Sequence, residues 1–399
     1  MKAKTLGTAC LEKQLLVCCA RTRVTADEAQ RIREIAAQPL DWDYLLSEAE
    51  ANSVTPLLER HLTAIAPDCP PPAAKEQLKN TSRANTVRCL YLSAELINIL
   101  KLFQAQEIPA LPYKGPVQAA QAYGDVALRE FDDLDIILRQ RDVARAHEVI
   151  LSLGYKAKFD WILSPEASES LIPGEYNYRD EPRRAMVELH TELTLRHFPV
   201  KPDLDYFLAR RMPVKVSNHE VLTFTAEDLL PMLCIHGSKD FWERFSWVAD
   251  VSELIQSHPA MDWDEVMRAT EPLGAGRMLL LGLALANGLL DAPLPAEILQ
   301  RVNADPTACE IGAEIQRMLM SRPSQTFDGA GRLRFRRSMR AGFVAGWRYV
   351  ARLAVVPAEE DWTMMRLPRP LAPLYIALRP FRLLRKYGWA GRQDPKPTA

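Results

Sequence analysis

The chain has 399 residues, of which 48% are hydrophobic and 25% are charged, and this balance is typical of a folded protein and excludes a disordered one. Its formal net charge of −1 gives no reason to expect nucleic acid or a membrane as a partner of the whole chain. The charge is uneven, because residues 329–399 hold fifteen Lys or Arg against four acids, a net charge near +11, and the remainder is near −12.

Seven cysteines at irregular spacing form no Cys-x-x-Cys or zinc-binding pattern, which favours reduced thiols and a cytoplasmic protein. The first residues show no clear apolar core of a secretory signal. The most apolar run, residues 278–286, is about half the ~20 residues that a bilayer-spanning helix needs. We therefore predict that this run is a buried helix.

Residues 1–107 are predicted to form a helical region. Thr25 and Glu28 have the spacing of a capping box, and apolar residues recur at helical spacing over 42–65 and 80–106. The pattern changes at Ile108, where a short extended segment ends in Lys114-Gly115. The chain then predicts helices over 117–123 and 142–153, and strands over 134–138, 155–161, 176–179 and 185–193.

Helices return from Ala226, with expected ranges 226–238, 241–257, 263–270, 274–290 and 308–321. We expect residues 108–215 to form the core sheet and residues 216–328 to complete a cleft against it. Residues 329–399 form a basic segment of short helices, in which we expect the tail 393–399 to be disordered. The fold class is therefore α+β, with a small mixed sheet flanked by N-terminal and C-terminal helical regions.

Two aspartates begin the strand expected over 134–138. Because side chains alternate along a strand, Asp133 and Asp135 point to one face of the sheet and their apolar neighbours to the other. Adjacent carboxylates repel each other in apolar surroundings, and both stay ionised only beside a positive charge. A hard divalent cation supplies this charge, and Mg²⁺ is usually held by a few carboxylates and substrate phosphates. The pair predicts a site for Mg²⁺ or Mn²⁺, with a structural or degenerate pair as the alternative.

Further polar residues have positions that could complete this site. Lys114-Gly115 ends the preceding strand, where a glycine lets backbone approach a phosphate. Glu188 lies in a later strand, with apolar residues on the alternate face, and His190 shares its face. We interpret Glu188 as a third acid of the site, and His190 as a contact to substrate or metal. The alternative for Glu188 is an ion pair with Arg183 or Arg184.

Several short blocks together resemble the nucleotidyltransferase superfamily. They are Leu111-Pro-Tyr-Lys-Gly-Pro116, Tyr123-Gly124, Arg129 and Asp132-Asp-Leu-Asp-Ile136, followed by Val187-Glu-Leu-His190 and the run from His236 to Asp250. They are most similar to a branch of bacterial nucleotidyltransferases with a Leu-Lys-Gly-Pro signature, and more distantly to AbiEii-type toxins. The likeness covers about residues 30–290.

This resemblance implies a nucleotidyltransferase-type sheet and a reaction. Asp133, Asp135 and Glu188 would be catalytic and would hold Mg²⁺ or Mn²⁺, and an NMP group would pass from an NTP to an unidentified hydroxyl. The acceptor could belong to a protein, a tRNA, a sugar or a small metabolite. Two departures from the superfamily pattern bear on turnover: its usual Gly-Ser is Gly115-Pro116 here, and the third acid is Glu where many relatives have Asp.

Other residues are candidate substrate contacts. Lys114, Gly115, Arg129, His190, His236 and Lys239 form this set. His236, Lys239, Asp240 and Glu243 have the spacing of one helical face, which is equally typical of a solvated face. Asp250 is expected to pair with an arginine, and Arg129 could instead neutralise the aspartates.

Three other functions compete with nucleotidyl transfer. A non-catalytic nucleotide-binding module of the same fold is favoured by Gly115-Pro116. A glycosyltransferase also uses Asp-x-Asp, but it would need a nucleotide-binding α/β domain where residues 1–107 are helical. The basic segment 329–399, with its interleaved aromatic residues, could contact a membrane surface or nucleic acid. The alternative favoured for this segment is that it packs against the acidic remainder of the chain.

Overall fold

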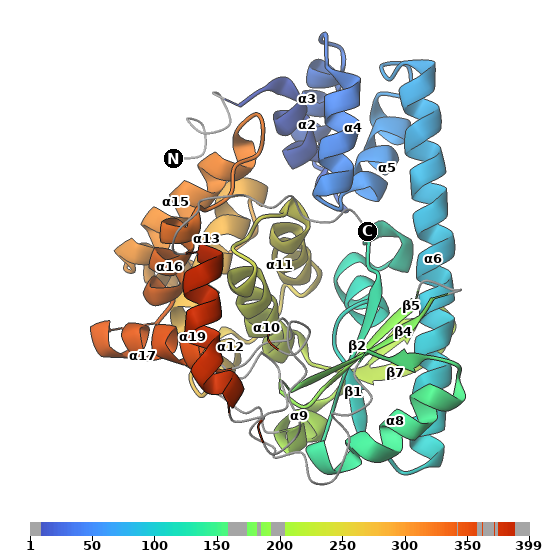
Figure 1. Ribbon diagram of the computed structural model, residues 1–399. Coiled ribbons are helices and arrows are strands. Elements are labelled where there is room, and N and C mark those ends of the chain that lie inside the picture. Colours follow the sequence, from blue (N-terminus) through green and yellow to red (C-terminus); the bar gives the residue numbers. More distant parts are fainter. Residues whose placement is uncertain are drawn as a thin grey trace.

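The computed structural model describes residues 9–158, 174–181, 185–192, 204–340, 342–356, 361, 371 and 374–387. Its first part is helical, as predicted, and Figure 1 shows these helices in blue. The elements are α2 (Leu11–Cys19), α3 (Ala26–Ala36), α4 (Trp42–Ala51), α5 (Thr55–Ile65) and α6 (Pro72–Ala105). Thr25 and Glu28 form the predicted capping box at α3. Helix α6 begins earlier than predicted, because Pro72 suits a first helical turn.

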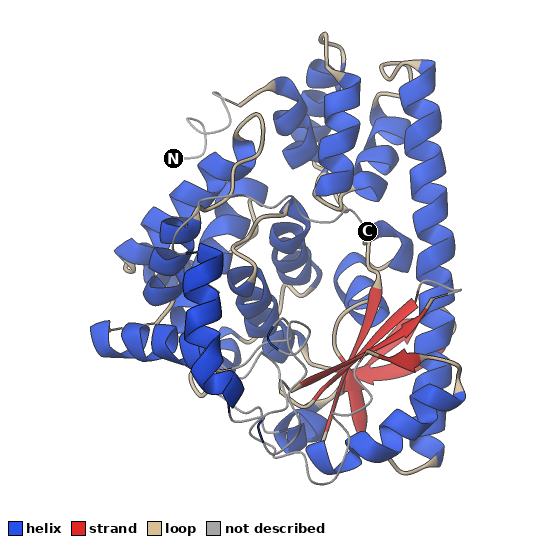
Figure 2. Ribbon diagram, viewed as in Figure 1, coloured by secondary structure: helices blue, strands red, loops and turns tan. Residues whose placement is uncertain are grey.

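The central part of the chain forms a five-stranded mixed sheet in the order β1-β2-β5-β4-β3. Its strands are β1 (Ala110–Pro112), β2 (Asp133–Leu138), β3 (Lys156–Ala157), β4 (Glu175–Asp180) and β5 (Ala185–His190). Strands β2 and β5 are parallel, and the other neighbours are antiparallel. Figure 2 shows this sheet in red among the helices, which confirms the α+β class.

Short helical elements connect the strands. They are α7 (Pro116–Gln118), the π-helical turn η1 (Ala119–Tyr123), the 3₁₀ turns η2 (Val126–Leu128) and η3 (Gln140–Asp142), and α8 (Val143–Ser152). The α-helix expected over 117–123 is therefore only partly α-helical. Strand β3 ends at Ala157, and residues 159–161 of the expected strand lie outside the described ranges.

The two faces of the sheet differ in character. On one face, Leu134 and Ile136 of β2 and Val187 and Leu189 of β5 are fully buried in a core with α6 and α8. The opposite face carries the alternate residues of the same strands, which are largely polar. Figure 1 shows α6 along one side of the sheet and α10 (Ala226–Lys239) and α11 (Phe245–Ser257) toward the other.

A helix and a hairpin that the sequence did not predict follow the sheet. They are α9 (Leu204–Arg210), β6 (Met212–Val216) and β7 (His219–Thr223), and β6 pairs with β7. The Thr223 hydroxyl donates to the Pro112 carbonyl oxygen over 2.7 Å, which ties the end of β7 to the edge strand β1.

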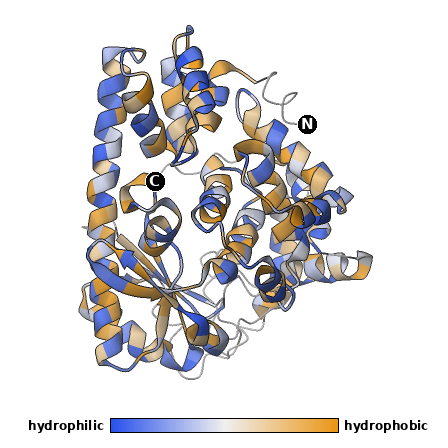
Figure 3. Ribbon diagram, turned by 180° about the vertical axis from the view of Figure 1, so that it is seen from behind, coloured by the Kyte–Doolittle hydropathy of each residue, from blue (hydrophilic) through white to orange (hydrophobic). Residues whose placement is uncertain are grey.

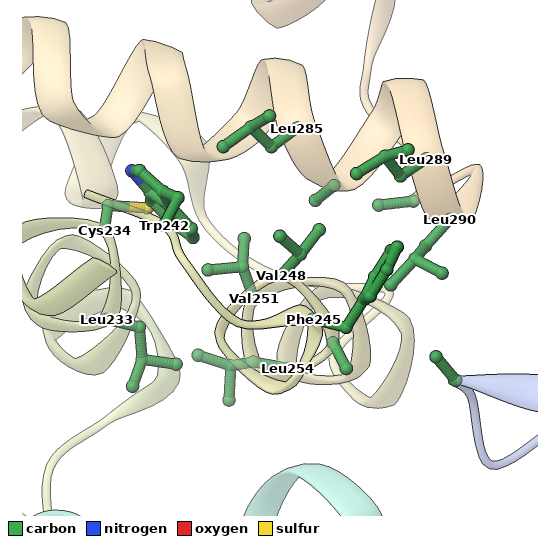
Figure 4. Close-up of a cluster of buried hydrophobic side chains, with 14 of the residues drawn as sticks. Leu233, Cys234, Trp242, Phe245, Val248, Val251, Leu254, Leu285, Leu289 and Leu290 are labelled. Atoms are coloured by element: carbon green, nitrogen blue, oxygen red, sulfur yellow. The ribbon is translucent and has the colours of Figure 1, made fainter. Parts of the chain in front are cut away.

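The remaining helices build a second core together with the N-terminal helices. They are α10, α11, α12 (Trp263–Thr270), α13 (Gly276–Leu290), α14 (Ala296–Asn303) and α15 (Pro306–Met320). Figure 4 shows Leu285 and Leu289 of α13 above Val248 of α11. The apolar run 278–286 is thus a buried helix, as predicted. Because α2–α5 share this core, the boundaries proposed at residues 107 and 216 stay an interpretation.

The helix ends after Lys239, before α11 begins. The prediction that Glu243 shares a helical face with His236 and Lys239 is therefore wrong. Helix α10 ends at Lys239, and Phe241 and Trp242 have positive φ angles of 61° and 55°. The cause is packing: the Trp242 side chain is fully buried, and it lies so close to Gly237 that a Cβ there would come within 2.7 Å of the ring. Glu243 consequently leaves the His236 face and pairs with Arg332 at 2.7 Å.

The described part of the basic segment 329–399 contains the helices α16 (Gly329–Ser338), α17 (Phe343–Val355) and α19 (Leu374–Tyr387). Figure 3 shows the molecule from behind, with the hydropathy of these helices and of the rest of the chain. No helix among the described residues is both long and apolar enough to cross a bilayer. The expected disordered tail, 393–399, lies outside the described residues.

Candidate active site

Strand register places the predicted acids next to one another on the polar face of the sheet. Asp135 on β2 is opposite Glu188 on β5, and Glu188 is opposite Asn177 on β4. In the same way, His190 on β5 is opposite Glu175 on β4. Strand pairing thus brings residues from three strands into two adjacent rows, although β2 lies far from β4 and β5 in the sequence.

Asp135 is at the centre of this cluster and is 1% exposed. Its Oδ1 atom accepts hydrogen bonds from Lys114 Nζ and from His190 Nε2, each over 2.9 Å. These two partners hold the pKa of the Asp135 carboxyl well below its usual range, against the opposing effect of burial. Its other oxygen, Oδ2, is buried and has no hydrogen-bond partner among the described residues.

Three side chains of the cluster have the geometry of a metal site. One ligand atom each from Asp135, Glu188 and His190 lies within 4.8 Å of the others. Asn177 Oδ1, next to Glu188 in the register, is also buried without a partner among the described residues. Unpartnered buried oxygens are costly, and a cation would satisfy them, so these residues fit a divalent metal.

Asp133 is not one of those three ligands, although the sequence predicted it as a metal residue. It lies on the same face of β2 as Asp135 and is partly buried. Burial, together with repulsion from the Asp135 carboxylate, raises the pKa of Asp133. A cation between the strands would lower that pKa, because it favours the ionised form of both acids.

His190 contacts both carboxylates of the cluster. Its Nε2 lies 3.5 Å from Glu188 Oε2 as well as next to Asp135, and its ring packs edge-on against Tyr113 with centroids 5.6 Å apart. Burial lowers the pKa of His190, but the hydrogen bonds to the two carboxylates outweigh it and raise the pKa to about 9. The imidazole is therefore cationic at neutral pH until a metal or substrate displaces the proton.

Glu175 and Asn177 are site residues that sequence reasoning missed. The expected strand began at residue 176, so Glu175 fell outside it, and only the pairing with β5 shows that both residues face His190 and Glu188. Although burial alone would raise it, the pKa of the Glu175 carboxyl is lowered by the charges of His190 and Lys239.

The Lys114-Gly115 segment lies against the aspartate strand. Gly115 has φ 58° and ψ −128°, a backbone conformation that only glycine adopts readily. A Cβ at Gly115 would lie 3.0 Å from the Asp133 carbonyl oxygen. The glycine is thus required by the close approach of its own chain to β2. Lys114, which sequence reasoning assigned to substrate, forms an ion pair with Asp135 here.

Arg129 forms a buried two-bond ion pair with Asp250 on α11, as expected for an acid paired with an arginine. Nε and Nη2 of Arg129 donate to the two carboxylate oxygens over 2.8 and 3.0 Å. The Tyr123 hydroxyl donates to the same carboxylate over 2.8 Å. This arrangement fastens the segment before β2 to α11.

His236 and Lys239 lie in the last turn of α10. Burial and the positive charges of Lys114 and Lys239 hold the pKa of His236 well below its usual range, so its imidazole is neutral. Its ring packs edge-on against Trp247, with centroids 5.5 Å apart. The end of α10 therefore brings a neutral imidazole and an ammonium group into electrostatic reach of the sheet acids.

Comparison with known proteins identifies the family. A model of a family described as uncharacterised nucleotidyltransferases matches residues 38–291, which is more than half of the chain. The chain belongs to this nucleotidyltransferase family. The matched range contains Asp133, Asp135, Glu188 and the end of α10, and it agrees with the range of the resemblance in the sequence. Nucleotidyl transfer is therefore the supported class of activity.

Two solved structures are similar to parts of the chain. The antibiotic-resistance factor ANT(2'')-Ia has 11% sequence identity and a TM-score of 0.31, over 44% of this chain and 88% of that one. An antigenic nucleotidyltransferase-like protein from Paracoccidioides brasiliensis has 16% identity and a TM-score of 0.30, over 53% of this chain and 94% of that one. No curated protein matches the chain.

Proposed function

We propose that this protein is a metal-dependent nucleotidyltransferase that moves an NMP group from an NTP to a hydroxyl acceptor. The observation that carries the proposal is the grouping of Asp135, Glu188 and His190 within 4.8 Å, with one Asp135 oxygen buried and unpartnered. Membership of the nucleotidyltransferase family supports the class of reaction.

The metal would be held by Asp135, Glu188 and His190, with Asp133 next to them on β2. A divalent ion at such a site supplies Lewis-acid stabilisation of the attacking and leaving oxygens at phosphorus. Glu188 is our candidate to accept the acceptor's proton, because its side chain is 16% exposed whereas that of Asp135 is fully buried and already accepts two hydrogen bonds.

Cationic side chains would bind the triphosphate. Lys239 at the end of α10 carries a positive charge that acts on Glu175, and neutral His236 can donate or accept a hydrogen bond. Lys114 would move from Asp135 toward a phosphate once a cation takes over the charge of that carboxylate. We assign Arg129 no contact with the triphosphate, because its guanidinium group is already paired with Asp250. Arg129 would instead hold the segment before β2 against α11.

The test is transfer of label from each α-³²P-labelled NTP with Mg²⁺ or Mn²⁺, in the presence of a desalted cell extract. Asp135→Asn is the site variant, and Asp132→Asn is its matched control. Asp132 is the adjacent aspartate of the same run, its side chain is 79% exposed, and it pairs with Arg88. We expect label in an acceptor fraction, and pyrophosphate release, for the wild type and Asp132→Asn. Equal transfer by Asp135→Asn would refute the assignment of the site.

A second candidate function is a non-catalytic nucleotide-binding module. Pro116 favours it, because it begins α7 directly after Gly115 and offers neither a hydroxyl nor an N–H group to a phosphate. This candidate predicts Asp135-dependent binding of NTP and metal without pyrophosphate release. The same assay, read together with equilibrium dialysis of the labelled NTP, separates the two functions.

A further inference from the structure

Helix α17 exposes an apolar stripe at the edge of the molecule. Val344 is 76% exposed, Trp347 44% and Val355 40%, although such side chains are usually buried. Their spacing of three and eleven residues puts them on one helical face, together with exposed Ala351. Figure 1 shows α17 on the opposite side of the molecule from α6.

Helix α19, which packs against α17, repeats this feature. Leu374 is 46% exposed, Leu378 39% and Phe381 71%. These residues are four and seven positions apart, and so they also share one helical face. Two neighbouring helices therefore present large apolar side chains to solvent, a combination that marks interaction surfaces.

The arginines of α16 differ from those of the next helix. Arg332 pairs with Glu243 at 2.7 Å and Arg334 pairs with Glu314 at 2.6 Å, so α16 is held by acids of the protein body. This part of the basic segment packs on its own chain, as the sequence analysis favoured. On α17, Arg348 and Arg352 are exposed and lie along the apolar stripe.

We propose that α17 and α19 form a docking surface for an anionic lipid bilayer. An amphipathic helix with aliphatic and aromatic residues on one face and arginines along it lies in a bilayer interface, where the arginines meet lipid phosphates. The exposed arginines Arg348 and Arg352 add positive charge beside the apolar stripe of α17, which complements the phosphates of an anionic leaflet. Trp347 and Phe381 could stack on bases, but the other exposed side chains of the stripes are aliphatic and offer neither hydrogen bonds nor stacking, so nucleic acid suits this surface less well than a bilayer does.

The experiment is co-sedimentation of the full chain with vesicles of phosphatidylcholine alone, or with about three tenths phosphatidylglycerol. Val344→Glu/Phe381→Glu disrupts both apolar stripes. Its matched control is Val87→Glu/Leu90→Glu, which makes the same kind of change at two exposed positions of α6, 63% and 50% exposed. Arg348→Gln/Arg352→Gln tests the charge, and circular dichroism verifies that each variant is folded.

We expect binding to the anionic vesicles that decreases as salt is added. Binding falls to background for Val344→Glu/Phe381→Glu and is unchanged for the α6 control. Partitioning falls about 30-fold for the double arginine variant, since each basic residue contributes about fivefold. The proposal is overturned if the wild type does not bind, or if the stripe variant binds equally well. It is also overturned if that variant instead dissolves a dimer seen by light scattering, or if the surface binds RNA and not vesicles.

Discussion

Replacing Asp250 with Asn removes the negative charge that faces Arg129 on the segment before the aspartate strand. The pair is well shielded from water, with side chains 11% exposed for Arg129 and 3% exposed for Asp250. Asn would keep one oxygen for the Tyr123 hydroxyl, which now donates to the carboxylate over 2.8 Å. The substitution therefore tests the charge pair while leaving the neighbouring hydrogen bond possible.

The cost follows from leaving a buried guanidinium group without its counter-charge. Removing one partner of a buried pair typically costs about 3–5 kcal/mol, and we expect about 3 kcal/mol here because Asn still accepts one hydrogen bond. A typical domain has only about 5–15 kcal/mol of stability, so this loss is large. In Arg129→Met/Asp250→Asn no buried charge remains, and we expect a coupling energy of about 2 kcal/mol between the two positions.

Urea unfolding, followed by tryptophan fluorescence and circular dichroism, compares Asp250→Asn, Arg129→Met and the double variant with the wild type. Additive losses in the double variant would refute the pairing. Affinity for a non-hydrolysable NTP analogue is measured on the same proteins. If Arg129 only anchors the segment, the double variant keeps the wild-type affinity. A stable double variant that no longer binds the nucleotide would instead assign Arg129 to the substrate.

Three further substitutions test other features. Burial raises the pKa of Glu130 to about 7 from 4.5. The protonated side chain therefore contributes about 3 kcal/mol of stability that is fully present below pH 4.5 and is lost as the pH rises through 7. Glu130→Gln should flatten this part of the pH dependence in urea unfolding between about pH 5 and 8. Replacing Gly282 with Ala would place a Cβ atom 2.4 Å from Cys234 Sγ. We expect the overpacking to cost about 1–3 kcal/mol, which exceeds the gain of about 1 kcal/mol in helix propensity. Gly282→Ala should therefore lower the melting temperature, and Cys234→Ala should restore part of it; a more stable Gly282→Ala would contradict the packing. In Gly115→Ala, the new Cβ atom would lie 3.0 Å from the Asp133 carbonyl oxygen on a backbone with φ 58°. We expect a loss of about 1–3 kcal/mol in stability and weaker Mn²⁺ binding. Unchanged Mn²⁺ binding in a titration would show that the close approach is dispensable.

Local patterns were sufficient to predict which polar side chains of β2 and β5 share a strand face. Strand alternation put Asp133 with Asp135 and Glu188 with His190, and the β2–β5 register then brings Asp135 opposite Glu188. The register itself could not be read from the sequence, because pairing between strands depends on the whole sheet. This is why Glu175, whose position opposite His190 is a property of β4, was missed.

Tertiary packing overrode local periodicity at the end of α10. The sequence predicted that the second helix begins at residue 241 and that Glu243 shares the face of His236, but burial of Trp242 against Gly237 and Gly282 requires a turn there, and α11 begins only at Phe245. The hairpin β6–β7 was hidden for a different reason. Pro213 argues against a strand, and Ser217 takes the positive φ of 53° that usually belongs to glycine or asparagine in such turns.

The measurement that tests the central claim most directly is Mn²⁺ binding, followed by electron paramagnetic resonance in the presence of a non-hydrolysable NTP analogue. With Asp135, Glu188 and His190 as ligands, Asp135→Asn should weaken binding by at least about tenfold, and the exposed Asp132→Asn should bind as the wild type does. Wild-type affinity should also increase from pH 7 to 9, because His190 has a pKa of about 9 and must release its proton to bind a metal. Undiminished Mn²⁺ binding by Asp135→Asn would contradict this metal centre.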